Sequence, residues 1–241
     1  METAVRLQKF LANQGIASRR EIERMIEEGR IEIDGNTAQL GDKIVPGVNQ
    51  VSVDGRVIRK QHIERMVLAI NKPRGLLCSH SDPHHSETIF DLLPDELKAM
   101  KWIMIGRLDK ESEGLVLMTN DGDFAHEISH PSYGMTKRYR VEINRPLDAV
   151  HIAKLLKGIE WKGERLQADK VIPLKNAKSE ERGLAEVHLH HGRKHEIRNL
   201  FYAFGYRVRR LRRTQIGNFT LKGLPIGTVR VLSPAEIATL K

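Results

Sequence analysis

Cysteine, aromatic residues and long apolar runs are scarce in this chain. A single cysteine, Cys78, occurs among 241 residues, which excludes a disulfide within the chain and any cysteine-based zinc finger. No apolar stretch approaches the length of a membrane span, and the N-terminal segment lacks the apolar core of a signal peptide. Aromatic residues make up 5% of the chain, too few for a single-strand reader that stacks successive bases on rings. We therefore expect a cytoplasmic protein with no membrane partner.

Acidic residues are scarce only near the C-terminus. The formal charge is +9 and the isoelectric point about 9.7. Residues 1–60 hold ten Lys and Arg against nine Asp and Glu, residues 61–181 hold eighteen against nineteen, and residues 182–241 hold twelve against three. An excess of positive charge spread evenly along the chain would indicate only a solubilising surface. Positive charge concentrated in one segment repels itself, and it predicts a polyanionic partner such as nucleic acid. The cluster consists of Arg207, Arg209, Arg210, Arg212 and Arg213.

The first sixty residues have the pattern of a small helical and stranded domain. Apolar residues recur at helical spacing from Val5 to Leu11, and a glycine ends each of two expected helices. The sequence Ser18-Arg19-Arg20-Glu21 predicts a capping box at the start of the second helix. Short alternating strands joined by Asp-Gly turns follow. We expect a domain over residues 1–60, a polar linker near residues 59–62 and a second domain over residues 61–241.

The first domain resembles the S4 (αL-type) RNA-binding domain over most of residues 5–53. The matching residues include Leu7 to Ala12, Gly15, Ser18 to Arg20, Gly29 to Ile31, Asp34-Gly35 and Gly41-Asp42. The resemblance implies that the second helix and the turn after it contact the RNA backbone, with Arg19, Arg20 and Arg30 as the contacts. The alternative is that these arginines pair with Glu23, Glu27 and Glu28 on a solvated helix.

From Met66 onward, strands and helices are mixed without strict alternation. Apolar runs at 67–70, 102–105 and 115–119 predict strands, and residues 138–143 alternate as a half-buried strand. Helices are expected from Asp148 to Lys157, from Glu196 to Phe204 and after Ser233-Pro234. We predict an α+β fold with a large, mostly antiparallel sheet and flanking helices.

One loop between two apolar strands holds a candidate catalytic group. It reads Gly106-Arg107-Leu108-Asp109-Lys110-Glu111-Ser112-Glu113-Gly114 and presents Asp109 at the end of a strand with Arg107 nearby. Loops fixed by rigid strands often hold catalytic residues. Spacing alone leaves a second interpretation open, a solvated acidic turn formed by Asp109, Glu111 and Glu113.

The motif Gly106-Arg107-Leu108-Asp109 resembles the segment that carries the catalytic aspartate in the pseudouridine synthases that act on ribosomal RNA, most closely the large-subunit type B group. The resemblance covers residues 66–235. Other blocks match in order: Asn71-Lys72-Pro73-Arg74-Gly75, Thr88 to Pro94, Lys137-Arg138-Tyr139, and Gly192-Arg193-Lys194-His195-Glu196-Ile197-Arg198. A core of this family with an S4 domain ahead of it accounts for nearly the whole chain.

The resemblance implies a uridine-to-pseudouridine isomerisation on a structured stem-loop of ribosomal RNA, with the target nucleotide flipped out of the helix. It makes Asp109, Tyr139 and Arg198 catalytic: an ionised carboxylate, an aromatic face for the base, and a guanidinium counter-ion. Arg107 fills the gap in the helix or holds a flanking phosphate. Attack on the sugar or base and proton removal to a glycal both remain open. No cofactor or metal is needed, because the reaction involves no net oxidation, reduction or hydrolysis. Further RNA contacts are expected from Arg193, Lys194, Arg209, Arg210 and Arg212.

Several alternatives remain at this stage. Ser112 stands where threonine is common in the family and keeps the hydroxyl, so little effect is expected. Asn199 stands where a second arginine is common, so one additional RNA contact is not expected there. The pair His190-His191 with His195, and the pair His84-His85, could suggest a metal site, but adjacent residues of a strand face opposite ways, so no metal is expected. Other functions are an inactive S4-type RNA-binding or ribosome-assembly factor, a synthase for the small subunit, and a magnesium-dependent RNA hydrolase. We expect a monomer, and the sequence does not identify the target uridine.

Overall fold

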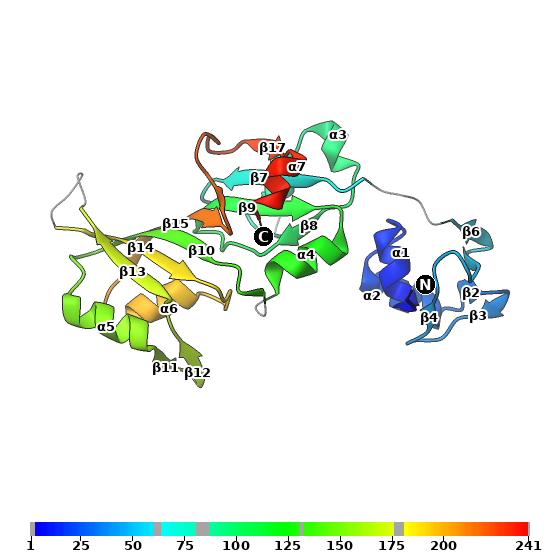
Figure 1. Cartoon of the computed structure of the whole chain (residues 1–241), viewed down its shortest axis with the longest axis horizontal. Helices are drawn as coiled ribbons and strands as arrows, with labels where there is room; N and C mark the ends of the chain where they lie inside the picture. The colour runs from blue at the N-terminus through cyan, green and yellow to red at the C-terminus, as the bar shows by residue number, and fades with distance from the viewer. Residues whose placement is uncertain (1–2, 60–63, 81–86, 131–132, 176–180, 241) are drawn as a thin grey trace. The chain divides into compact units, whose positions relative to one another are not determined.

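A computed structural model describes residues 3–59, 64–80, 87–130, 133–175 and 181–240 and divides the chain into two compact units, Met1–Arg65 and Met66–Lys241 (Figure 1). Residue 60, where the sequence placed the domain boundary, lies outside the described residues, as do residues 61 and 62 of the expected linker. Each unit has its own buried apolar core. None of the helices in the described ranges is long and apolar enough to cross a membrane.

The first unit packs two short helices against a small antiparallel sheet (Figure 1). Leu7, Leu11 and Ile22 are fully buried between these elements. The helices are α1 (Leu7–Asn13) and α2 (Arg19–Glu27). The sheet has the strand order β3 (Asn36–Thr37), β2 (Ile31–Ile33), β5 (Val51–Val53) and β6 (Arg56–Ile58), and a separate pair joins β1 (Val5–Arg6) to β4 (Lys43–Ile44).

Of the two hydrogen bonds of the capping box expected at the start of α2, one is formed. The Ser18 hydroxyl accepts a hydrogen bond from the amide of Glu21 at 3.2 Å, as the sequence predicts. The Glu21 carboxylate accepts from the guanidinium of Arg24 in the next turn. An exposed carboxylate gains more from a nearby guanidinium than from a neutral backbone amide, because the hydrogen bond is charge-assisted on both sides. The complete capping box forms instead at the last helix, between Ser233 and Glu236.

The second unit is built on a nine-stranded sheet, and the predicted α+β class is confirmed. Neighbouring strands are antiparallel except β9 and β15, which run parallel. The order is β13 (Lys170–Leu174), β14 (Gly183–Leu189), β10 (Lys137–Ile143), β15 (Val208–Ile216), β9 (Glu113–Thr119), β7 (Val67–Lys72) and β17 (Val229–Val231), with β8 (Ile103–Ile105) beside β9 and β16 (Phe219–Thr220) beside β15. A separate hairpin joins β11 (Ile159–Trp161) to β12 (Glu164–Leu166).

Apolar residues cover both faces of this sheet where β7 and β9 pair. Leu68 and Val116 belong to one buried cluster, whereas Ala69 and Leu115 belong to the other. Alternate residues of a strand face opposite sides, so a strand buried on both faces reads as an unbroken apolar run. The flanking helices are η1 (Ile89–Leu92), α3 (Asp95–Lys98), α4 (Gly122–Ser129), α5 (Ala149–Lys157), α6 (Glu196–Tyr202) and α7 (Pro234–Ala238).

The basic segment after residue 206 is a strand, which the sequence pattern did not predict. It forms β15, an inner strand of the sheet between β10 and β9. Its arginines therefore lie at different depths: Arg209 and Arg210 are exposed, Arg212 is half-buried and Arg213 is buried. The segment is not a single surface patch, because alternation along a strand sends successive side chains to opposite faces.

Candidate active site

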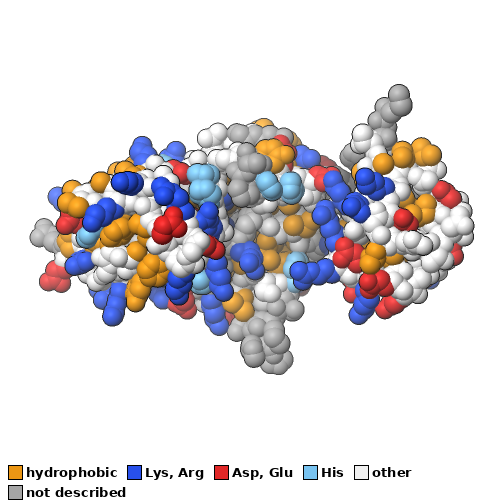
Figure 2. Space-filling view, turned by 90° about the horizontal axis from the view of Figure 1, so that it is seen from below, with side chains coloured by type: hydrophobic (Ala, Val, Ile, Leu, Met, Phe, Trp, Pro, Cys, Tyr) orange, Lys and Arg blue, Asp and Glu red, His pale blue; other side chains and the backbone are white. Residues whose placement is uncertain are grey.

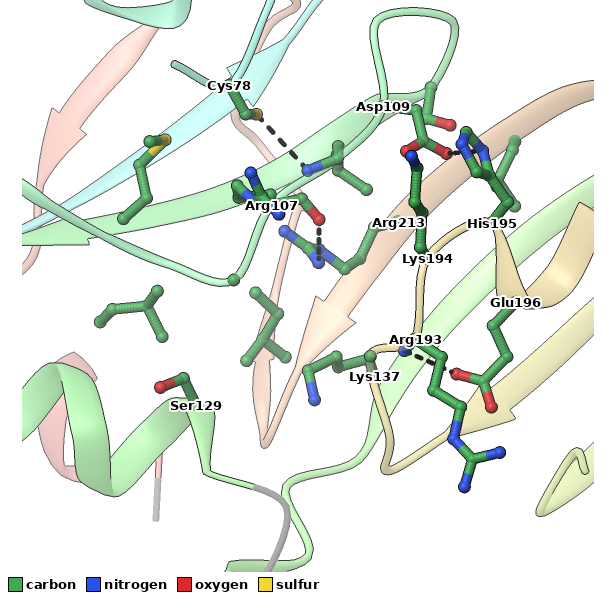
Figure 3. Close-up of a pocket in the computed structure, with 18 of the residues that line it drawn as sticks. Cys78, Arg107, Asp109, Ser129, Lys137, Arg193, Lys194, His195, Glu196 and Arg213 are labelled. Carbon is green, nitrogen blue, oxygen red and sulfur yellow. Dashed lines mark hydrogen bonds and ion pairs between the residues drawn. The ribbon is translucent and has the colours of Figure 1, made fainter. Parts of the chain in front are cut away.

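A cavity of about 930 Å³ opens in the second unit, large enough for a nucleoside (Figure 3). Its walls come from the loop before β9, from strands β10 and β15, and from the segment that leads into α6. Of the residues predicted from the sequence, five line it: Arg107, Asp109, Tyr139, Arg193 and Lys194. Arg198 does not line it, nor do Arg209, Arg210 and Arg212.

A buried lysine holds the loop that presents Asp109. Lys72 lies at the end of β7 and is fully buried. Its Nζ donates to the backbone carbonyls of Asp109 at 3.2 Å, Lys110 at 3.3 Å and Ser112 at 2.7 Å, and to that of Pro73 at 3.1 Å. Burial lowers the pKa of Lys72, and the nearby carboxylates oppose that shift. Asp109 is therefore carried by a backbone that is tied to the core of the sheet.

A histidine lies beside the Asp109 carboxylate. His195 Nδ1 lies 3.2 Å from Asp109 Oδ2, so the two form an ion pair when the imidazole is protonated (Figure 3). The side chains remain 44% and 34% exposed, respectively. His195 is the N-cap residue of α6, with the left-handed φ of 54°, which a non-glycine residue adopts only at some cost in free energy.

The expected ion pair between Asp109 and Arg198 is not formed in the described chain. Arg198 donates instead to the Glu111 carbonyl at 3.2 Å, to the Ser112 hydroxyl at 3.3 Å and to the Val208 carbonyl at 3.3 Å. The hydroxyl of Ser112 thus serves as an acceptor for this arginine. Arg198, in the first turn of α6, therefore contacts the loop at Glu111 and Ser112, whereas His195 at the N-cap contacts the Asp109 carboxylate.

Tyr139 and Arg213 lie on neighbouring strands, and both line the cavity. Tyr139 on β10 is 7% exposed and pairs in register with Arg213 on β15. Arg213 in turn pairs with Gly114 on β9, whose φ is +106°. A Cβ at Gly114 would lie 2.2 Å from the Arg213 carbonyl oxygen, so only glycine allows the two parallel strands to approach this closely.

A second buried lysine fixes the segment before α6. Lys137 Nζ lines the same cavity and donates to the carbonyls of Met135 at 3.4 Å, His190 at 3.1 Å and His191 at 3.3 Å. Burial, with a smaller contribution from the positive charge of Arg213, lowers the pKa of Lys137 to about 8. Lys72 and Lys137 therefore anchor the two segments that bring Asp109 and His195 together.

This arrangement predicts a loss of activity above about pH 8. There the Lys137 amine becomes neutral and retains two N–H donors for three carbonyls, so at least one of these hydrogen bonds is lost and His195 is positioned less well, although the fold as a whole is not destabilised. Between about pH 8 and about pH 10.4, the pKa of lysine in an unfolded chain, the folded state binds fewer protons than the unfolded state. The free energy of unfolding therefore rises with pH in this range. The measurement is kcat/KM against pH. Lys137→Arg, which stays charged, should move the alkaline fall upward, and an identical profile for both proteins would contradict this role.

The other predicted basic residues divide into free and engaged side chains. Arg107 and Lys194 are exposed at the cavity, and Arg193 donates to the Arg165 carbonyl of β12. Arg210 is held by the Glu113 carboxylate, at 2.8 Å from Nε and 2.7 Å from Nη2, and Arg212 Nε lies 3.9 Å from the same carboxylate. The sequence next to this arginine cluster holds almost no carboxylates, and the carboxylate that Arg210 contacts comes from a distant segment, because the parallel pairing of β9 and β15 brings in Glu113.

In the first unit, Arg30 is engaged within the protein. It donates to Asp54 through Nε at 2.8 Å and Nη2 at 2.7 Å, and to Glu28 at 3.1 Å. These hydrogen bonds, Asp54 first, raise the pKa of Arg30 further above its already high value. Arg19 and Arg20 are exposed on α2. RNA contact by Arg30 would require exchange of carboxylate partners, whereas Arg19 and Arg20 are open to solvent.

No group of three or more metal-ligating side chains occurs within the ranges that the structure covers. His190 pairs with Asp169 at 2.7 Å, and its ring lies 3.7 Å from that of His191. These two rings do not point to opposite faces as a strand would require, because β14 ends at Leu189. His84 and His85 lie outside the described residues.

Sequence reasoning assigned no role to Lys72, Lys137, His195 or Arg213. Lys72, Lys137 and His195 lie inside the motifs that resemble the family. The sequence therefore gives their positions but does not show what they contact. His195 was weighed only as a metal ligand, and Arg213 only as part of the basic cluster.

The chain belongs to the RNA pseudouridylate synthase family, whose model matches residues 66–203, and residues 5–49 match the S4 domain. The solved crystal structure of a pseudouridylate synthase superposes with a TM-score of 0.69 at 28% identity, over 98% of this chain and 100% of that one.

Among curated relatives, the chain is similar to ribosomal large subunit pseudouridine synthase B. The protein of that name from Escherichia coli strain K12 is 39% identical over 242 residues, covering 98% of this chain and 82% of the relative. The one from Haemophilus influenzae is 40% identical over 227 residues, and the match spans 63% of that relative's length.

Proposed function

We propose that this protein isomerises a uridine of large-subunit ribosomal RNA to pseudouridine, with Asp109 as the catalytic carboxylate. The observation that carries the proposal is the placement of Asp109 and Tyr139 on the wall of one cavity of nucleoside size, in a chain of this family. The reaction breaks the bond between ribose C1′ and N1 of uracil, turns the base and rebonds it through C5.

Each residue has a role that its surroundings support. The Asp109 carboxylate, on a loop anchored by Lys72, attacks the nucleotide or removes a ribose proton. Tyr139 offers a buried aromatic face on which the everted base can stack, which offsets part of the few kcal/mol that base flipping costs. Arg198 acts on Asp109 indirectly, as a positioning residue that holds the carbonyl of Glu111 and the hydroxyl of Ser112. His195 holds the carboxylate in place until substrate arrives.

RNA contact is supported by the distribution of free positive charge. One face of the second unit displays more Lys and Arg than Asp and Glu side chains (Figure 2). Arg107 and Lys194 are exposed at the cavity, where phosphates flanking the everted nucleotide would lie. Arg19 and Arg20 on α2 are the candidate backbone contacts of the S4 domain.

The test is isomerisation of unmodified ribosomal RNA fragments, without added cofactor and with a chelator present. We expect pseudouridine at one position in large-subunit RNA. Product only in small-subunit RNA would reassign the substrate, activity that the chelator abolishes would favour the hydrolase alternative, and binding without product would leave an RNA-binding factor.

Replacing Arg209, Arg210 and Arg212 with glutamine is expected to weaken RNA binding and flatten its salt dependence. Each lost phosphate contact lowers the slope of log Kd against log salt by about 0.7 to 0.9. We expect a fall of about one to two units, with the largest share from exposed Arg209, since Glu113 already holds Arg210. Arg230→Gln, on β17 and paired with Glu236, is the matched control. An unchanged slope in the triple variant would place β15 away from the RNA.

A further inference from the structure

Three buried cations line or adjoin the cavity without a carboxylate partner. Lys72, Lys137 and Arg213 are 0%, 7% and 2% exposed. Their hydrogen bonds within the described chain go to backbone carbonyls, and none of the three forms an ion pair there. A buried charge without a counter-ion is costly, so this concentration of positive charge favours a ligand that carries or develops negative charge.

Arg213 differs from the two lysines because it retains an unused donor. Its Nε donates to the Leu115 carbonyl at 2.6 Å and its Nη1 to the Arg107 carbonyl at 3.4 Å. Its Nη2 is buried and has no partner among the described residues. Figure 3 shows the guanidinium beside the Arg107 segment, among the side chains that line the cavity.

The surrounding structure holds this guanidinium rigidly. β15 is paired on both sides, to β10 and to β9, and Gly114 allows the close approach at Arg213 itself. A Cβ at Gly106 would lie 3.8 Å from Arg213 Nη1, so the loop before Asp109 packs directly on the guanidinium. A donor fixed in advance gains the most in catalysis, because it need not reorganise as charge develops.

The base is a better match for Arg213 than a phosphate is. Tyr139, which offers the stacking face for the base, is the register partner of Arg213 across the strands. The exposed cations Arg107, Arg193 and Lys194 lie at the cavity as well and suit phosphates, which stay hydrated. A guanidinium that is 2% exposed suits an oxygen that enters the cavity with the base.

We propose that Arg213 stabilises the negative charge that uracil acquires when its bond to ribose breaks, by donating from Nη2 to a carbonyl oxygen of the base. This inference rests on the proposed function. When the C1′–N1 bond breaks, both electrons go to the base, and the anion is shared among N1, O2 and O4. After the base turns, an electron pair from C5 forms the new bond to C1′. The proton on C5 then passes to water and N1 takes up one proton from water, so the base has neither gained nor lost a proton overall. Arg213 gains and loses no proton in this sequence.

The experiment measures single-turnover rates and RNA Kd separately for wild type, Arg213→Gln and Arg213→Lys. Two RNAs are used, one with uridine and one with 5-fluorouridine at the target, and consumption of the target nucleotide is followed. Fluorine withdraws electrons and stabilises the detached base, so less help from the protein is needed. Arg230→Gln, remote from the cavity, is the matched control.

With uridine, Arg213→Gln should lower the rate constant by about 10²- to 10³-fold, and Arg213→Lys, which keeps the charge, by about tenfold. Kd should stay within about threefold, and with 5-fluorouridine the loss in Arg213→Gln should shrink to less than about tenfold. If the glutamine variant fails to fold, the lysine variant carries the same comparison of substrates.

Equal losses with both substrates, or a loss confined to Kd, would overturn this role and leave Arg213 a structural or phosphate-binding residue. A wild-type protein with no activity on any ribosomal RNA would overturn the proposed function and this inference with it. If the wild type is active and Arg213→Gln has the same single-turnover rate constant, the inference alone would be overturned.

Discussion

Asp109→Asn is expected to abolish pseudouridine formation and to leave RNA binding intact. Asparagine keeps the shape of the side chain but supplies neither the charge nor the basicity that the reaction requires. Since the role that we propose for the carboxylate is in bond breaking itself, we expect the single-turnover rate to fall by at least about 10⁴-fold. The side chain is one third exposed and leaves no buried group unpaired when replaced, so the fold should be unaffected.

The measurement pairs product analysis with RNA binding. Asp95→Asn on α3, a largely exposed aspartate that does not line the cavity, is the control for loss of one surface charge. We expect the Kd of Asp109→Asn to stay within about threefold of the wild-type value. Product formed by this variant at more than a hundredth of the wild-type rate would remove Asp109 from the reaction.

Lys72→Met should cost both stability and activity. Methionine fills a similar volume but leaves three carbonyls of the loop that holds Asp109, and the carbonyl of Pro73, without their donor. Burial lowers the pKa of Lys72, so the protonated amine itself opposes folding and its removal offsets part of the loss. We expect the free energy of unfolding to fall by about 2 kcal/mol. Displacement of Asp109 by about 1 Å should lower kcat by roughly 10²-fold.

Chemical denaturation and steady-state kinetics test this prediction together. Lys98→Met, at an exposed lysine that pairs with Asp95, controls for the loss of a positive charge and should be neutral in both measurements. A Lys72→Met protein with wild-type kcat would show that the loop keeps its conformation without the lysine.

Much of the local structure followed from periodicity and capping residues. The helix from Asp148 to Lys157 is α5, bounded by the cap and the glycine that the sequence places there, and Ser233 and Glu236 form the expected capping box. The α+β class followed as well, because apolar runs and alternation distinguish buried from half-buried strands. β15 was missed, since five arginines between residues 207 and 213 conceal the alternation that a strand would show.

The sequence by itself determined the family, the order of its motifs and the acidic residue at the centre of the loop, because these are properties of short segments. The tertiary structure alone decided which groups each side chain contacts. Asp109 pairs with His195 instead of Arg198, and Arg210 pairs with Glu113. Arg213 is buried and donates to the carbonyl of Leu115, 98 residues away in the chain. Such contacts depend on how distant strands pair, above all on the parallel pairing of β9 and β15, and no local pattern of residues encodes that pairing.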